Sequence, residues 1–434
     1  MKTQHRTLYL FMNGIHIGTL EKTNKGILTF RYEQSWLDRP GARPISLSLP
    51  LIKEPFVGDI VYHFFDNLLP DNSQIRARIQ AKFHVTTDQP FDLLAAIGKD
   101  CVGAIQMISD KTLPIRENIL AEPLSDGEIA SVLRGYKNYP LGMIDDLSDF
   151  RISIAGAQEK SAFLFYQNKW QRPLGGTPTT HIFKLPIGII QEKNIDLTHS
   201  CENEWLCTQI AKAFGLAVAE CEILYFNDVK VLSVKRFDRK LSSDKNWIIR
   251  LPQEDICQAL GLSSYLKYEA DGGSGIKEIM KLLLGSINPE EDRDAFFRSQ
   301  VLFWLLAAID GHAKNFSLFI EPEGKYRLTP LYDIISAYPL IAAGQLQKQK
   351  IKMAMALSGK NKHYHWHQAQ RRYFIETAKQ VDYSEKKASI ILDEMLDKTD
   401  LVIAEVSKKL PNHFPVEISQ PIFDGMQFMK KQLL

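Results

Sequence analysis

AAIDGHAKNFSLFIEPEGKYRLTPLYDII, residues 307–335, is the stretch of sequence that decides the fold. Asp310 and Asn315 stand five residues apart, and Asp333 follows after two short apolar runs, FSLFI and KYRL. In phosphoryl-transfer sites, this order places an aspartate that orients a hydroxyl group before an asparagine and a second aspartate that hold magnesium. The two apolar runs predict strands that turn at the intervening EPEG. We therefore expect a loop, a hairpin and a metal-binding aspartate in succession.

A second group of residues offers the positive charge that a polyphosphate needs. Lys184 ends the strand-like run HIFK, as a lysine ends the V-A-I-K strand of kinases. The small-residue turn AGAQEK, residues 155–160, lies between two strand-like runs and could cradle a nucleotide, although it has no G-x-G-x-x-G or Walker signature. Glu204 lies in or near the first turn of a later helix. It could pair with Lys184 or simply favour that helix terminus.

Each of these residues also has an ordinary structural interpretation. The D-x-x-x-x-N spacing recurs by chance about once in a chain of this length. Asp310 could end a helix, Asn315 could form a turn, and Asp333 could be an exposed loop acid. Lys184 could be a solvated strand lysine. The joint order of the three acidic and amide residues around a hairpin favours the catalytic interpretation.

Histidines offer further candidates. His312, inside the predicted catalytic loop, could touch a phosphate or be satisfied by backbone groups. His363, His365 and His367 alternate as three imidazoles on one face of a strand would, and such a face could hold a metal ion. No cysteine or acid stands beside them at ligand spacing, so we predict an exposed polar loop there.

The composition is that of a globular protein, with 434 residues, 45% of them hydrophobic and 24% charged. This length predicts two or three domains of roughly 100 to 200 residues each. The longest apolar run, residues 301–309, is far shorter than the roughly 18 residues of a membrane span, and no secretory signal is readable. Five cysteines without a C-x-x-C pair predict reduced thiols. We expect a cytoplasmic protein, and the net charge of +2 excludes nucleic-acid binding through bulk charge.

The order of predicted elements indicates an α+β fold. Alternating runs at residues 7–12 and 26–32, with a turn signal at Asn13-Gly14, predict a small antiparallel sheet. Residues 42–51 look extended, and a helix is expected from Asp59 until Pro70. Further strands follow, with a hairpin that turns at Asn227-Asp228, and beyond Asp238 the signals are mainly helical. A sheet-rich half before a helical half predicts two lobes.

With these motifs in place, the sequence resembles a known family nearly end to end. The stretches RPISLSLPL, FFDNLLPDN, FRISIAGAQEK, PTTHIFKLPIG, KYEADGG, DGHAKNFSLFI and YRLTPLYDIISAYP resemble the HipA family of bacterial serine/threonine-protein kinase toxins. The resemblance implies a bilobal protein-kinase-like fold. It divides the chain into a HipA-specific β-rich subdomain at residues 1–110, a kinase N-lobe at residues 111–238 and a helical C-lobe at residues 239–434.

The resemblance also implies roles for individual residues. Asp310 is expected to be the catalytic base, Asn315 and Asp333 the magnesium ligands, and Lys184 the lysine on the ATP phosphates. The other expected ATP-binding residues are Ala155, Gly156, Ala157, Gln158, Glu159, Lys160, Lys235, Arg236, Phe237, Asp238, His312 and Tyr332. Among these, residues 235–237 are expected to meet adenine, with Asp238 beside the ribose. Lys235 stands where relatives often have an acid, but a contact through backbone groups would survive that change.

Ser153 matches the family's autophosphorylation position. A phosphoserine adds about −1.5 to −2 charge, and here it would stand beside a loop expected to cradle a triphosphate. Repulsion should then expel the loop and block ATP binding, so self-phosphorylation would switch the kinase off. From the residues alone, we would read Ser153 only as a strand residue bonded to its own backbone.

The resemblance further implies a toxin of a toxin–antitoxin pair. The expected partners are a HipB-type helix-turn-helix antitoxin, operator DNA reached mainly through that antitoxin, and an aminoacyl-tRNA synthetase substrate, typically glutamate–tRNA ligase, whose phosphorylation arrests growth. Two other classes of function remain open. A small-molecule kinase of the aminoglycoside-phosphotransferase kind would phosphorylate a metabolite, and a catalytically dead co-repressor would consume no ATP.

Overall fold

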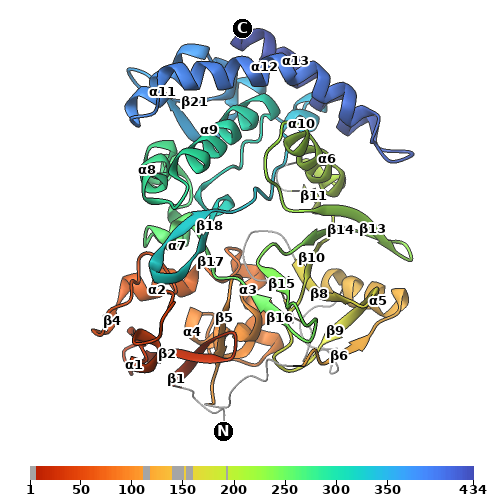
Figure 1. The fold of residues 1–434 in the computed structure, drawn as a ribbon. Helices are drawn as coiled ribbons and strands as arrows, with labels where there is room; N and C mark the ends of the chain where they lie inside the picture. Colours follow the sequence, from red (N-terminus) through yellow and green to blue (C-terminus); the bar gives the residue numbers. More distant parts are fainter. Residues whose placement is uncertain (1–5, 111–117, 139–150, 153–159, 192–193) are drawn as a thin grey trace. The chain divides into compact units, whose positions relative to one another are not determined.

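The computed structural model describes residues 6–110, 118–138, 151–152, 160–191 and 194–434. The chain divides into two compact units (Figure 1). Unit 1 comprises Met1–Leu185, Leu224–Tyr265 and Leu318–Tyr326, and unit 2 comprises Pro186–Ile223, Leu266–Ser317 and Arg327–Leu434. Each unit is therefore assembled from segments that are far apart in the sequence.

Unit 1 begins with an N-terminal module, residues 7–108, whose antiparallel sheet has the strand order β4-β3-β2-β1-β5. Asn13 and Gly14, both with positive φ, form the two-residue turn between β1 and β2, as an Asn-Gly pair favours. Leu8, Leu10 and Phe30 are fully buried in a core shared with the helices. The elements are β1 (Thr7–Met12), β2 (Ile15–Lys22), β3 (Leu28–Tyr32), α1 (Gln34–Leu37), β4 (Phe56–Val57), α2 (Asp59–Asp66), α3 (Ser73–Lys82), α4 (Pro90–Ile97), η1 (Gly98–Asp100) and β5 (Ile105–Ile108).

The rest of unit 1 is built on a second sheet with the order β13-β14-β10-β8-β9-β6, in which β7 also pairs with β8. Its core contains Phe163, Phe183 and Phe226, whose rings pack in series beside the apolar face of α5. The main elements are β6 (Ala121–Pro123), α5 (Asp126–Asn138), β7 (Arg151–Ile152), β8 (Lys160–Tyr166), β9 (Lys169–Pro173), β10 (His181–Lys184), β13 (Cys221–Phe226) and β14 (Val229–Lys235). Shorter elements are β15 (Arg239–Leu241), β16 (Ile248–Arg250), β17 (Gln253–Asp255), α7 (Ile256–Ala259), η3 (Ser264–Leu266), β18 (Ser317–Ile320), η7 (Pro322–Gly324) and β19 (Tyr326–Leu328).

Unit 2 is mainly helical, and its core surrounds α9 (Pro289–Leu306), which packs against α12 and α13 (Figure 1). Pro289 occupies the first turn of α9, where a missing N–H costs no helical hydrogen bond. Near the other end, Trp304 is fully buried. The other elements are β11 (Gly188–Ile190), β12 (Ile195–Leu197), α6 (Ser200–Ala213), η4 (Glu269–Asp271), α8 (Ile276–Leu282), η5 (Leu283–Gly285), η6 (Ala313–Asn315), α10 (Tyr338–Ala342), η8 (Lys348–Lys350), β20 (Lys352–Ser358), β21 (Lys362–His365), η9 (Trp366–Gln368), α11 (Arg371–Gln380), α12 (Glu385–Ser407) and α13 (Val416–Leu433).

The mixed sheet and helix content confirms the α+β prediction, and two local predictions were wrong. His363 and His365 lie in strand β21, which pairs with β20, and His363 stacks on Tyr373 with ring centroids 3.8 Å apart, so this segment is not an exposed loop. Residues 42–51 are not a continuous extended run, because Ser46 and Leu49 form an isolated bridge around a turn. The boundaries at residues 110 and 238 stay predictions. No helix within the described ranges is long and apolar enough to cross a membrane.

Candidate active site

The predicted catalytic loop follows directly from α9, whose C-cap residue, Ala307, has left-handed backbone angles that end the helix. The backbone oxygen of Asp310 accepts two hydrogen bonds, from the His312 amide at 2.8 Å and from Asn315 Nδ2 at 2.7 Å. The backbone amide of Asn315 in turn donates to the backbone oxygen of His312 at 2.9 Å. These bonds fix the backbone of the loop, while the side chain of Asp310 stays exposed to solvent.

Gly311 has a steric role in this loop. A β-carbon at this position would lie 2.3 Å from the ring of Phe303, a distance that packed atoms do not tolerate. Phe303 belongs to the buried face of α9, so the ring has little room to move. Glycine therefore lets the loop lie close against the helix that precedes it.

Tyr268 is a site residue that the sequence reasoning missed. Its hydroxyl donates to Asp310 Oδ1 at 2.5 Å, and its ring packs edge-on against His312 with centroids 5.0 Å apart. The neighbouring Lys267 oxygen accepts from the Ala313 amide at 3.1 Å. The stretch KYEADGG contributes to the family resemblance, but no spacing rule links it to a residue 42 positions later. Only the fold of unit 2 brings the two together.

Asp333 has a φ of 57°, which is uncommon for a residue with a side chain and concentrates at functional sites. The chain is anchored on both sides of it. Leu331 exchanges hydrogen bonds with the backbone of residues 217 and 219, at 2.9 and 2.8 Å. Beyond Asp333, Asn203 on α6 makes two hydrogen bonds to the backbone of Ser336. The unusual backbone angle is therefore imposed by packing on either side.

Tyr332 connects the segment of Asp333 to the catalytic loop. Its hydroxyl lies 2.6 Å from the Ser317 hydroxyl and donates to the Lys314 oxygen at 2.9 Å. His312 is buried, with 6% of its surface exposed. Asp310, His312, Asn315, Tyr332 and Asp333 all belong to unit 2, so one compact unit carries the predicted base and both predicted metal ligands.

The chemistry of the predicted metal ligands fits magnesium. Asn315 directs its amide nitrogen to the Asp310 backbone, which orients its side chain, and its amide oxygen and the Asp333 carboxylate are hard donors of the kind that magnesium prefers. The described residues contain no group of three or more histidine, cysteine or acidic side chains that could hold a metal ion. A site here would therefore depend on a few protein oxygens together with phosphate oxygens.

The predicted phosphate-binding lysines lie in unit 1. Lys184 ends β10, with 4% of its surface exposed, and its Cα is directly paired with that of Lys160 on β8. Directly opposite residues project from the same face of a sheet, so the two lysine side chains leave the sheet on one face. Ser153 and residues 155–159 lie outside the described residues. Glu204 is buried on α6 in unit 2, and its predicted pairing with Lys184 stays a prediction.

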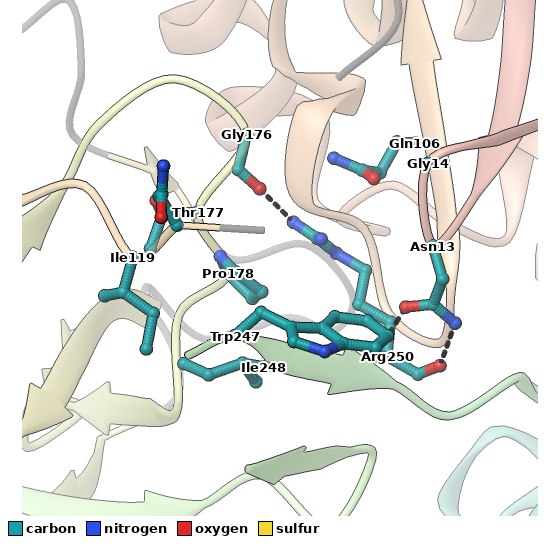
Figure 2. A pocket seen from close by; sticks show the side chains of 11 residues that line it. Asn13, Gly14, Gln106, Ile119, Gly176, Thr177, Pro178, Trp247, Ile248 and Arg250 are labelled. Carbon is teal, nitrogen blue, oxygen red and sulfur yellow. Dashed lines mark hydrogen bonds between the residues drawn. The ribbon is translucent and has the colours of Figure 1, made fainter. Parts of the chain in front are cut away.

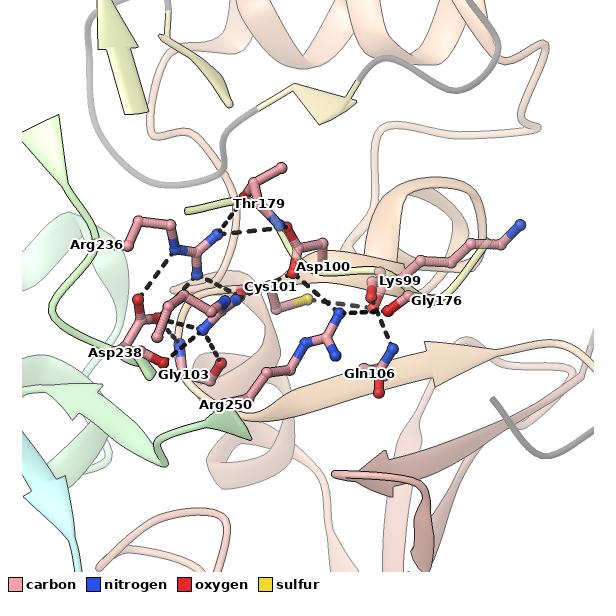
Figure 3. A network of polar contacts seen from close by, with 12 residues as sticks. Lys99, Asp100, Cys101, Gly103, Gln106, Gly176, Thr179, Arg236, Asp238 and Arg250 are labelled. Atoms are coloured by element: carbon pink, nitrogen blue, oxygen red, sulfur yellow. Dashed lines mark hydrogen bonds and ion pairs between the residues drawn. The ribbon is translucent and has the colours of Figure 1, made fainter. Parts of the chain in front are cut away.

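The segment of residues 235–238 has two kinds of residue. Lys235 is exposed and Phe237 is partly exposed, whereas Arg236 and Asp238 are buried. Arg236 Nε and Nη2 donate to the two oxygens of Asp238 at 3.0 and 2.8 Å, within the polar network drawn in Figure 3. Burial by itself would raise the pKa of Asp238, but Arg236 and Arg239 lower it below its usual value. Both residues thus have a structural role, and their contact with adenine or ribose stays a prediction.

Comparison with known proteins decides the family. The profile of the HipA-like C-terminal domain matches residues 152–403, and that of the HipA N-terminal domain matches residues 8–108. The chain belongs to the HipA family. It is 33% identical to "Putative kinase Y4mE" of Sinorhizobium fredii over 77% of this chain and 78% of that protein. It is also 28% identical to the serine/threonine-protein kinase toxin HipA of Shewanella oneidensis, over 76% of this chain and 75% of that protein.

The fold agrees with this membership. A solved complex of HipA, HipB and operator DNA from Shewanella oneidensis contains a chain that superposes with a TM-score of 0.81 at 22% identity, covering 98% of this chain and 97% of that one. The kinase-like fold predicted from the sequence is therefore confirmed. As a HipA-family protein, the chain is a protein kinase, and kinases use ATP as phosphate donor.

Proposed function

We propose that this chain is a toxin kinase that transfers the γ-phosphate of ATP to a serine or threonine of a translation factor. One observation carries the proposal: the Asp310 carboxylate is exposed, while the backbone of its loop is fixed by His312 and by Asn315. A base must be held in place and still be accessible to the substrate hydroxyl. The loop meets both requirements.

Four residues of unit 2 have a part in this proposal. Asp310 accepts or orients the proton of the attacking hydroxyl, and Tyr268 holds one carboxylate oxygen so that the other can face the substrate. Asn315 and Asp333 would hold magnesium, which would supply positive charge against the phosphates of ATP. The remaining contribution of these residues is to align the reacting groups, which accounts for much of the catalysis in phosphoryl transfer.

The paired lysines of unit 1 support a phosphate site. Lys160 and Lys184 are direct cross-strand neighbours, so both side chains leave the same face of the sheet. Two ammonium groups on one face could both bind the phosphates of ATP. We therefore assign the phosphates of ATP to this pair and to the loop of residues 155–159, and the adenine to residues 235–237 with Asp238 near the ribose.

We infer the partners by analogy with the family. The Shewanella oneidensis HipA was solved in a toxin–antitoxin complex with HipB and operator DNA, and we extend that assembly to this chain. An antitoxin of the HipB type would neutralise the kinase and supply most of the DNA affinity. We further propose glutamate–tRNA ligase as the substrate and Ser153 as the site of inactivating autophosphorylation.

Transfer of labelled phosphate tests the proposal. The purified chain is incubated with γ-labelled ATP, magnesium and glutamate–tRNA ligase, beside reactions that contain other aminoacyl-tRNA synthetases or an aminoglycoside. We expect label on the synthetase and, by mass spectrometry, phosphate on Ser153 that a Ser153→Ala variant lacks. Label on the aminoglycoside would indicate a small-molecule kinase, and no consumption of ATP in any reaction would indicate a non-catalytic co-repressor.

A further inference from the structure

Asp100, in the N-terminal module, is the centre of a buried ionic network (Figure 3). The residue is 1% exposed. Its Oδ1 accepts from Arg239 at 3.0 Å and from Arg250 at 3.2 Å. Its Oδ2 accepts from the amide and the hydroxyl of Thr179, at 3.0 and 2.7 Å, and more distantly from Arg236 at 3.4 Å. These four residues all lie outside the N-terminal module.

The backbone beside Asp100 takes part as well. The Cys101 oxygen accepts from Arg236 and from Arg239, both at 2.9 Å, and the Gly103 oxygen accepts from Arg239 at 2.8 Å. In the reverse direction, the Gly103 amide donates to Asp238 Oδ2 at 2.8 Å. A β-carbon on Gly103 would lie 2.7 Å from the Gln253 backbone oxygen, so only glycine allows this approach. Residues 100–103 therefore bond both buried residues of the segment 235–238, which are Arg236 and Asp238.

A second contact joins the same two parts of unit 1. The side chain of Asn13, in the turn between β1 and β2, donates to the Arg250 oxygen at 2.8 Å and accepts from the Arg250 amide at 2.9 Å, as Figure 2 shows. Arg250 also donates to the Gly176 oxygen at 2.9 Å. The pocket beside these residues has a volume of about 10 Å³, room for roughly one water molecule. This contact therefore connects two parts of unit 1 and does not form a ligand site.

The charges explain what such a network can do. Three arginines and two aspartates are buried together, and backbone oxygens accept further hydrogen bonds from the arginines. Because desolvation offsets most of the Coulomb attraction, buried ion networks often add little stability over apolar packing. They do demand one arrangement, since each polar group that loses its partner costs free energy. The network therefore specifies the backbone positions of residues 236 and 238.

We infer that the N-terminal module sets the nucleotide affinity of the kinase through this network. Arg236 and Asp238 are positioning residues: their side chains are held inward by residues 100–103, which leaves Lys235 and Phe237 presented on the other side of the segment. The ring of Phe237 is also held edge-on to Phe319, with centroids 5.7 Å apart. Asp100, which lies outside the kinase N-lobe, then controls how well adenine is bound. This inference rests on the proposed assignment of residues 235–238 to the nucleotide.

Two variants of the full chain and one matched control test the inference. Asp100→Asn removes the central charge, and Thr179→Val removes only a hydroxyl that bonds Asp100 and Arg236. The control, Asp66→Asn, breaks a buried ion pair with Arg76 elsewhere in the same module, with a 2.7 Å contact and side chains 4% and 11% exposed. Circular dichroism first gives the unfolding temperature of each protein. At a temperature where all of them are folded, titration calorimetry then measures the affinity for a non-hydrolysable ATP analogue with magnesium.

We expect the Kd for the analogue to rise about tenfold in Asp100→Asn and about threefold in Thr179→Val, in the range of known couplings between distant residues. Asp66→Asn should stay within about twofold of the wild type even though its unfolding temperature falls, because its ion pair does not bear on residues 235–238. An unchanged Kd in Thr179→Val and in any folded Asp100→Asn would overturn the inference, as would an equal rise in the control. If Asp100→Asn does not fold, Thr179→Val decides. A wild-type chain that binds no analogue would refute the proposed function itself.

Discussion

Asp100 in unit 1 and Asp310 in unit 2 show two opposite ways of using a carboxylate. Asp100 is 1% exposed, and arginines together with a threonine bond both of its oxygens. Asp310 is exposed, and one of its carboxylate oxygens accepts a hydrogen bond from the Tyr268 hydroxyl. A carboxylate surrounded by buried donors can hold a structure together but cannot accept a substrate proton. The difference supports our proposal that Asp310 is the residue that performs the chemistry.

Replacing Asp310 tests this comparison with the largest expected effect. Asp310→Asn keeps the shape of the side chain and removes its basicity, so the rate of phosphate transfer should fall by about 10²–10⁴-fold, the usual contribution of a general base. The matched control is Asp397→Asn, because Asp397 is an exposed acid on α12. Initial rates with labelled ATP give the comparison. A variant at position 310 with wild-type rates would show that another group is the base.

Replacing an arginine of the buried network tests the structural role of Asp100. Arg239→Met leaves the buried charges of Asp100 and Asp238 with fewer partners. Removing one member of a buried ion pair typically costs about 3–5 kcal/mol, whereas an exposed pair contributes up to about 1 kcal/mol. Lys409→Met, which breaks an exposed pair with Glu405, is the control. Urea denaturation measures both, and equal losses of unfolding free energy would contradict the distinction.

Glu254 sharpens the comparison because it is a buried carboxylate whose charge is poorly compensated. It is fully buried and accepts from the Leu47 amide at 2.8 Å, and burial raises its pKa to about 8. A carboxyl whose pKa is higher in the folded protein than in the unfolded chain favours folding at low pH. That stabilisation is complete below the unfolded pKa of about 4.5 and is lost as the pH rises towards 8.

The variant Glu254→Gln removes this titration. Relative to the wild type, it should be similar in stability near pH 5 and more stable by about 2–4 kcal/mol near pH 9, since each pKa unit corresponds to about 1.4 kcal/mol. Urea midpoints of both proteins at pH 5, 7 and 9 measure the difference. A difference that does not change with pH would show that Glu254 is ionised at all three values.

Tyr268 gives the smallest expected effect. Tyr268→Phe keeps the ring against His312 and removes the hydroxyl that holds Asp310 Oδ1. A hydrogen bond to a charged group contributes about 1.5 kcal/mol or more, so kcat should fall about tenfold, while the KM for ATP should stay unchanged. A rise in kcat would contradict this role, because it would mean that the tyrosine blocks the substrate hydroxyl instead of orienting the base.

The sequence predicted local elements well and long-range contacts poorly. The hairpin at Asn227, the strand that ends at Lys184 and the helix from Asp59 follow from short-range patterns, and the structure confirms them. The Tyr268 contact and the Asp100 network could not be predicted, because the first joins residues 42 positions apart and the second joins residues 79 to 150 positions apart. Periodicity and turn signals describe neighbours in the chain, whereas these contacts depend on how the strands and helices pack.

Binding of magnesium with an ATP analogue tests the central claim most directly. The claim is that Asp310 aligns the hydroxyl whereas Asn315 and Asp333 hold the metal. Titration calorimetry of the wild type, Asp310→Asn and Asp333→Asn, with and without magnesium, separates these roles. We predict that magnesium strengthens binding of the analogue to the wild type and to Asp310→Asn alike, and that this gain is lost in Asp333→Asn. A full magnesium-dependent gain in Asp333→Asn would contradict the account.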